Sequence, residues 1–175
     1  MEAYFDNSAT TIVTDSVKDI VVKTMTEDFG NPSAMHMVGV KAEKYIKEAQ
    51  ENIAKILKVD PKEIFFTSGG TESNNMAIIG TAMANKRKGN KIITTSVEHS
   101  SVLATMKYLE EQGFEVIYLP VDRYGVVQME ALEKEMTEDT ILVSTMYVNN
   151  EVGAIEPVGE IGQYIKKVNP SVVYH

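Results

Sequence analysis

Apolar residues recur at helical spacing in two stretches before residue 60. The first predicted helix begins at a cap formed by Thr14 or Asp15, and its apolar face contains Val17, Ile20, Val21, Met25 and Phe29. The second spans about 38–57, with an apolar stripe of Ala42, Tyr45, Ile46, Ala49, Ile53, Ile56 and Leu57. A Gly-Asn-Pro-Ser breaker at 30–33 separates them, and a short β-like run at 2–5 precedes both. The two helices come before any well-marked strand and can lie apart from a sheet as an arm.

From Ile64 onward the pattern alternates between short apolar runs and helical stripes. Strands are predicted at 64–67, 91–96, 114–119 and 141–148, and a further strand starts at 172. Helical stripes lie between them, at about 71–86, 102–109, 129–136 and 158–168. The run at 141–148 has no polar alternation, which is typical of a strand covered on both faces. This alternation predicts an α/β fold with a mostly parallel sheet flanked by helices.

Three polar junctions follow predicted strands, at Ser68–Ser73, Ser96–Ser101 and Asn149–Gly153. In parallel sheets, ligands bind beyond the carboxyl ends of the strands. We therefore expect these three loops to converge on one site.

The first junction combines a strand end, a Gly69-Gly70 turn and a helix start. Free backbone N–H groups and the helix dipole favour an anion there, and phosphate above all. The glycines allow close backbone approach and a positive φ, and Thr71 and Ser73 can add hydroxyl donors. Glu72 fits only if its carboxylate points away. The alternative is a plain strand-to-helix turn with a Ser/Thr cap, since neither a Walker loop nor a G-x-G-x-x-G motif is present.

The other two junctions each allow a structural interpretation as well. His99 can be a helix-start histidine whose ring is satisfied by backbone, and Asn149-Asn150 can be ordinary turn residues. His36 has no obvious partner in the sequence, and His175 stands at the end of it.

Composition excludes several classes of protein. The 175 residues carry a formal net charge of −8, so neither nucleic acid nor an anionic membrane surface is an expected partner. The apolar runs are too short to span a bilayer, and no export leader is recognised, so a cytoplasmic location is expected. The absence of cysteine rules out disulfides, cysteine–metal sites and a cysteine nucleophile within these residues, and no metal is expected.

Five motifs in register resemble the cysteine desulfurases of the nitrogen-fixation and iron–sulfur assembly type. They lie at 7–11 (Asn-Ser-Ala-Thr-Thr), 29–33 (Phe-Gly-Asn-Pro-Ser), 66–74 (Phe-Thr-Ser-Gly-Gly-Thr-Glu-Ser-Asn), 98–99 (Glu-His) and 148–153 (Val-Asn-Asn-Glu-Val-Gly). The resemblance implies a pyridoxal 5'-phosphate (PLP) enzyme of the class V aminotransferase fold. Residues 1–30 would then be an N-terminal arm and helix. Residues 31–175 would be part of the large, cofactor-binding domain of the fold type I transferases.

The resemblance also implies roles for individual residues. Gly70 and Thr71 match the pair that holds the cofactor phosphate. His99 matches the catalytic histidine that stacks on the pyridine ring and assists proton transfer, and a flat imidazole suits both tasks. Asn150 matches the asparagine beside the ring hydroxyl, close to the substrate. L-Cysteine as substrate, a homodimer and a sulfur-acceptor or scaffold protein of iron–sulfur assembly are further expectations.

The sequence departs from the family's pattern by lacking its reacting groups. The family's aspartate that pairs with the pyridine nitrogen, its Schiff-base lysine and its sulfur-accepting cysteine all lie beyond the strand that starts at Val172. We expect these residues alone to be inactive, with Val172–His175 forming an edge that pairs with another chain.

Three other functions stay open from the sequence. One is another class V lyase or transaminase, such as selenocysteine lyase, and another is a non-catalytic dimerisation module. A nucleotide-binding domain is disfavoured, because the glycine loop has no lysine and no acidic residue in register for a ribose.

Overall fold

A computed structural model describes residues 3–175 and divides the chain into two compact units. We call the part that ends at Phe66 the helical unit, and Thr67–His175 the sheet unit. Within the described residues no helix combines the length and apolar character needed to cross a membrane.

The helical unit contains α1 (Asp15–Thr26), α2 (Met37–Leu57) and a short 3₁₀ helix, η1 (Pro61–Glu63). Both predicted helices are thus confirmed, although α1 buries none of its residues and α2 buries only Gly39, Ala42 and Ala54. Asp60 caps η1 by accepting the Lys62 N–H. The apolar stripes seen in the sequence therefore remain largely exposed in this unit.

A charged cluster holds α1 and α2 together. The carboxylate of Asp28, a residue only 2% exposed, pairs with Lys41 and accepts a hydrogen bond from the Tyr45 hydroxyl. Lys23 of α1 lies 3.7 Å from the same carboxylate. These hydrogen bonds and cations, Lys41 first, lower the pKa of Asp28. The contact between the two helices is thus polar where a small domain would ordinarily use a hydrophobic core.

Two predicted N-terminal strands are not formed. The expected strand at 64–67 is wrong: this segment is extended but has no strand partner, and Phe65 and Phe66 are exposed. The side-chain amide of Gln50, in α2, donates to the Ile64 carbonyl oxygen at 3.0 Å. Residues 3–5 of the β-like run are also irregular, and residue 2 lies outside the described residues. β-type residues form a strand only where a neighbouring strand accepts their backbone hydrogen bonds.

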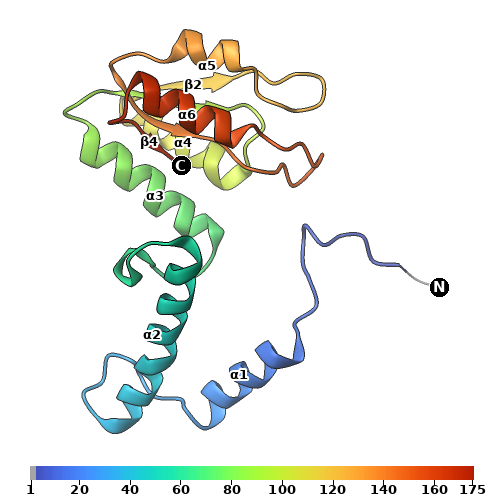
Figure 1. The fold of residues 1–175 in the computed structure, drawn as a ribbon, viewed down its shortest axis with the longest axis vertical. Coiled ribbons are helices and arrows are strands. Elements are labelled where there is room, and N and C mark those ends of the chain that lie inside the picture. The colour runs from blue at the N-terminus through green and yellow to red at the C-terminus, as the bar shows by residue number, and fades with distance from the viewer. Residues whose placement is uncertain (1–2) are drawn as a thin grey trace. The chain divides into compact units, whose positions relative to one another are not determined.

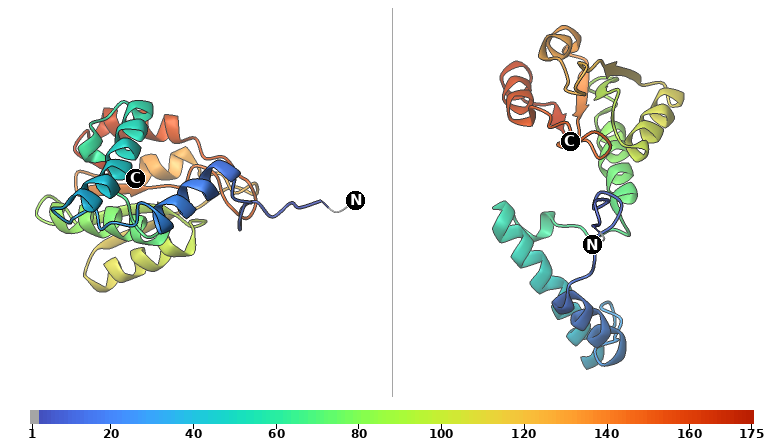
Figure 2. Two further views of the ribbon diagram at one scale, coloured as in Figure 1. Left: turned by 90° about the horizontal axis from the view of Figure 1, so that it is seen from below. Right: turned by 90° about the vertical axis from the view of Figure 1, so that its right-hand side faces the viewer.

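The sheet unit has four parallel strands in the order β2-β1-β3-β4, which confirms the predicted fold class. They are β1 (Lys91–Thr95), β2 (Glu115–Leu119), β3 (Thr140–Ser144) and β4 (Val173–Tyr174). The helices are α3 (Gly70–Asn85), α4 (Ser100–Glu111), α5 (Met129–Glu135) and α6 (Val158–Val168). Figure 1 and the right-hand view of Figure 2 show them on both sides of the strands.

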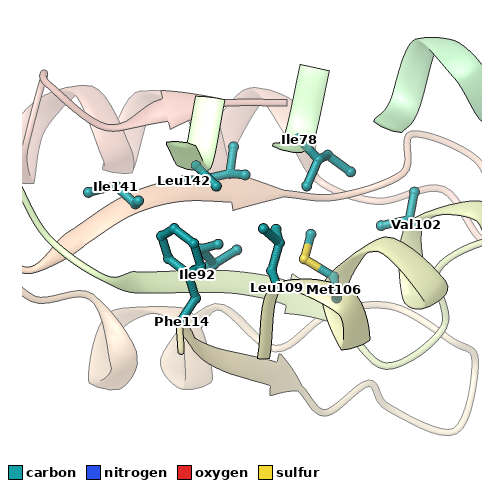
Figure 3. Packing of buried hydrophobic residues seen from close by; sticks show 9 residues of the cluster. Ile78, Ile92, Val102, Met106, Leu109, Phe114, Ile141 and Leu142 are labelled. Atoms are coloured by element: carbon teal, nitrogen blue, oxygen red, sulfur yellow. The ribbon is translucent and has the colours of Figure 1, made fainter. Parts of the chain in front are cut away.

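The core forms one cluster on each face of the sheet. On one face, residues of α3 and α4 pack on Ile92 and Leu142, as Figure 3 shows with Ile78, Met106, Leu109 and Phe114. On the other face, Ile93 and Val143 meet residues of α5 and α6, among them Leu132, Ile161 and Ile165. All residues of β1 and β3 are buried, as expected for central strands covered on both sides. This rigid centre positions the loops at the carboxyl ends of β1 and β3.

The strand predicted at 141–148 is about half as long as expected. β3 ends at Ser144, and the chain then turns back on itself, with Val148 and Ile155 forming an antiparallel bridge. The Glu156 N–H donates to the Tyr147 carbonyl at 2.9 Å, which closes this loop. The second half of the apolar run lies in this loop, where Tyr147 and Val148 are exposed, a difference that periodicity does not reveal.

Candidate functional site

The start of α3 presents three backbone N–H groups without helical partners. The first bond within the helix runs from the Ser73 N–H to the Gly69 carbonyl at 3.1 Å, which leaves the N–H groups of Gly70, Thr71 and Glu72 free of the helix ladder. The Gly69 backbone is extended (φ 164°), and neither glycine adopts the left-handed conformation that glycine allows. A Cβ added at Gly69 or Gly70 would meet nothing within 4 Å. The glycines therefore leave open space beside the helix start.

The Glu72 carboxylate is held by Ser68. It accepts hydrogen bonds from the Ser68 N–H and the Ser68 hydroxyl, both at 2.6 Å. The hydroxyl bond, followed by the backbone bond, lowers the pKa of Glu72. Ser73 is also engaged, since its hydroxyl lies 2.6 Å from that of Thr67. The remaining donors at the helix start are the three N–H groups and the Thr71 hydroxyl, a set that suits an anion.

His99 is the N-cap of α4 and is connected to α3 through one serine. Its Nδ1 accepts the Ser101 N–H at 3.1 Å and lies 2.9 Å from the Ser101 hydroxyl oxygen. The same oxygen accepts a hydrogen bond from the Asn74 side-chain amide at 2.9 Å, and Asn74 belongs to the second turn of α3. The imidazole is therefore held at the same end of the sheet as the free N–H groups of α3.

Glu98 joins the ends of β1 and β3. Its side chain is buried, and Oε1 accepts hydrogen bonds from the Thr95 hydroxyl and from the Met146 N–H, each at 2.7 Å. Burial raises the pKa of Glu98, as does the Glu156 carboxylate, while the two hydrogen bonds lower it. A buried carboxylate next to His99 thus holds two strand ends together.

Asn149 performs a similar task for the third junction. It is buried, donates to the Val97 carbonyl oxygen at 3.0 Å, and accepts the N–H groups of Glu151 and Val152 at 2.9 Å each. Two of the three predicted loops, at 96–101 and 149–153, are therefore directly hydrogen-bonded to each other.

Asn150, by contrast, is exposed, and its side-chain amide donates to Glu151. Among the described residues no hydrogen bond joins Asn150 to Gly70, Thr71 or His99. The structure thus connects His99 to α3, and connects the Asn150 loop to the chain just before His99.

The sequence alone did not identify four residues whose hydrogen bonds hold these loops and His99 in place: Asn74, Glu98, Ser101 and Asn149. Glu98 and Asn149 stand beside the predicted His99 and Asn150 in the motifs at 98–99 and 148–153. The only signal available was a polar residue directly after an apolar strand. Which neighbour turns inward depends on packing.

A cavity of about 640 Å³ lies in the helical unit between Glu27 and α2 and is lined by Met37, Val38 and Lys41 among others. It contains none of the predicted site residues. In the described residues, no group of three or more His, Asp or Glu side chains is arranged to hold a metal ion.

The parallel sheet with helices on both faces is the fold of the fold type I class, and comparisons with known proteins agree. The aminotransferase class-V family model matches residues 3–174, and the chain belongs to this family. It is 48% identical over 168 residues to the cysteine desulfurase IscS of Clostridium botulinum, covering 96% of this chain and 42% of that protein.

Solved structures give the same result. A NifS-like protein superposes with a TM-score of 0.95 at 47% identity, covering 100% of this chain and 48% of that one. A structure of SspA in complex with cysteine has a TM-score of 0.91 at 37% identity, covering 98% and 49%. The chain thus spans about two fifths of the length of the curated relatives it matches.

Proposed function

We propose that this chain supplies the amino-terminal part of a PLP-dependent cysteine desulfurase, which converts L-cysteine to L-alanine and transfers the sulfur to an enzyme cysteine as a persulfide. The observation that carries the proposal is 48% identity over 96% of the chain to a cysteine desulfurase. The similar SspA structure is a complex with cysteine, which supports the same substrate class. No specific observation favours selenocysteine lyase.

The residues at the start of α3 fit the cofactor's phosphate. The free N–H groups of Gly70, Thr71 and Glu72 and the Thr71 hydroxyl are all donors, and the Glu72 carboxylate is occupied by Ser68. When bound, PLP supplies an electron sink for the carbanion formed at the substrate's α-carbon. The helix dipole adds favourable electrostatics for a dianion.

The other site residues bind and orient. We assign His99 to stacking on the pyridine ring and to proton transfer. Asn150 is assigned to the cofactor's ring hydroxyl and the substrate. Asn149 and Glu98 hold the loops that carry these two residues.

We further propose the two-part organisation of an arm at 1–30 and a cofactor domain from 31 onward, within a cytoplasmic homodimer that passes sulfur to an acceptor or scaffold protein of iron–sulfur assembly. Dimer formation is supported by α1, where Val17, Ile20, Val21 and Met25 are each about half exposed or more. Association through Val172–His175 stays a prediction. Sedimentation velocity measurements on the 175-residue chain test whether it associates at all, through the exposed face of α1 or through Val172–His175.

The phosphate site is tested with pyridoxamine phosphate, which lacks the aldehyde and so does not react with surface lysines. We expect it to bind at least about tenfold more tightly than pyridoxamine, since one charge-assisted hydrogen bond contributes about 1.5–3 kcal/mol. Thr71→Ala should weaken binding of the phosphate ester alone, whereas Thr81→Ala, towards the C-terminal end of α3, is the matched control. Equal affinity for both ligands would refute the assignment of the phosphate site.

Activity has a separate test. The 175 residues contain no cysteine, so we expect no alanine release from L-cysteine in the presence of PLP. Turnover by the purified chain would contradict the assignment of sulfur transfer to a cysteine thiolate outside these residues.

A further inference from the structure

The hydrogen bonds around His99 determine which ring nitrogen carries the proton. The Ser101 N–H points at Nδ1 at 3.1 Å, and a backbone N–H can only donate. A proton on Nδ1 would therefore face another donor. The neutral ring that satisfies this cap is protonated on Nε2.

The Ser101 hydroxyl reinforces this preference, and Asn74 sets its direction. Asn74 Nδ2 donates to the Ser101 hydroxyl oxygen at 2.9 Å, and this leaves the hydroxyl proton free to point at His99 Nδ1, also 2.9 Å away. The direction is fixed because the side-chain NH₂ of asparagine can only donate. Ser101 is only 8% exposed, so few water molecules compete for these bonds. The result is a chain of hydrogen bonds from the Asn74 side-chain amide through the Ser101 hydroxyl to His99 Nδ1. We call this chain the relay.

We propose that Asn74 and Ser101 are positioning residues that hold His99 as the Nε2–H tautomer, so that the resting imidazole presents a hydrogen-bond donor to its reaction partner. The chemical consequence rests on the proposed function, whereas the tautomer itself is a property of this chain alone. To accept a proton, the neutral ring must use Nδ1, which requires breaking the cap with the Ser101 N–H. Proton uptake by His99 is therefore coupled to the start of α4.

The same chain contains an internal comparison. His36 also caps a helix through Nδ1, accepting the Gly39 N–H at 3.2 Å at the start of α2. No hydroxyl donates to His36 among the hydrogen bonds of the described residues. His36 thus reports the effect of a backbone cap alone, and His99 the effect of a cap with a serine and an asparagine behind it.

The test is long-range ¹H–¹⁵N NMR of ring-labelled histidine in the full 175-residue chain without cofactor, at a pH where the rings are neutral. The chemical shifts of Nδ1 and Nε2 give the tautomer fractions for each histidine. We expect His99 to be almost entirely Nε2–H, and more so than His36. The tautomer fractions are measured without any ligand, so they do not depend on whether the chain binds pyridoxamine phosphate. The proposed function and this inference can therefore fail independently.

Variants then isolate the relay. Ser101→Ala should raise the Nδ1–H fraction of His99 about fivefold, the effect of one hydrogen bond of about 1 kcal/mol. Ser101→Thr should restore the wild-type value, because it keeps the hydroxyl. Ser100→Ala is the matched control: Ser100 is exposed, and its hydroxyl takes part in no hydrogen bond of the described residues.

Asn74→Asp provides a second test that leaves Ser101 in place. An aspartate accepts the Ser101 hydroxyl proton and so turns it away from Nδ1, which should also raise the Nδ1–H fraction of His99 while His36 is unchanged. A substantial Nδ1–H fraction in the unsubstituted chain, or equal effects of Ser101→Ala and Ser100→Ala, would overturn the proposal.

Discussion

Removing the carboxylate of Glu98 separates two roles of this side chain, as a hydrogen-bond acceptor and as a buried charge. In Glu98→Ala, the Thr95 hydroxyl and the Met146 N–H both lose their acceptor. An unpaired buried group costs about 1–3 kcal/mol, so we expect a total loss of about 3 kcal/mol in unfolding free energy. Glu98→Gln retains an oxygen acceptor and should stay within about 1 kcal/mol of the unsubstituted chain.

The pH dependence gives the second half of the prediction. Burial raises the pKa of Glu98 in the folded state above its ordinary value of about 4.5. Between these two values the folded state binds more protons than the unfolded state, so the stability of the unsubstituted chain falls as pH rises. Glutamine does not titrate. Glu98→Gln should therefore gain stability relative to the unsubstituted chain as the pH rises from about 4.5 towards neutrality.

The assay is urea unfolding at about pH 4.5 and about pH 7.5, followed by the NMR signals of the Ile92 and Ile93 amides in β1. Signals from one strand are used because they report on the sheet unit alone. The reasoning would be refuted if Glu98→Gln were as damaging as Glu98→Ala at both pH values. That result would mean that the charge itself, and not the acceptor, holds the two strand ends.

Two further predictions concern other buried polar groups. Asn149→Ala removes hydrogen bonds to three backbone groups and should cost about 2 kcal/mol in urea unfolding, whereas exposed Asn150→Ala should change stability by less than about 0.5 kcal/mol; similar losses in both would contradict the assignment of the loop contact to Asn149. Hydrogen bonds from Lys41 first and then from Tyr45 lower the pKa of Asp28 in the folded state. The Asp28 carboxylate therefore stabilises the α1–α2 contact at neutral pH. This stabilisation is lost as the pH falls below about 3.8 and passes through the lower pKa of the folded state. Asp28→Asn should lose helical circular dichroism on mild heating at neutral pH and show no further acid transition in this unit; an acid transition identical to that of the unsubstituted chain would place the titrating group elsewhere.

The sequence by itself determined the elements whose pattern is local. Helices α1 and α2 follow from apolar residues at helical spacing, and the parallel sheet follows from strand–helix alternation with uniformly apolar central runs such as Ile141–Val143. The polar junctions after β1 and β3 were also readable, because the carboxyl ends of parallel strands lie at one edge of a sheet. Periodicity reports which residues share a face, and a helix makes its hydrogen bonds within itself.

The tertiary structure decided what depends on a partner distant in the chain. Residues 64–67 have β-type side chains but remain irregular, because a strand requires hydrogen bonds from a neighbour and none is present. Likewise, only the packing shows that Asn149 turns inward while Asn150 faces solvent, and that Glu72 bends back to Ser68. The tautomer of His99 is likewise decided by tertiary structure. Asn74, which lies 25 positions earlier in the sequence, orients the Ser101 hydroxyl towards His99, and this contact exists only once α3 and α4 have packed together.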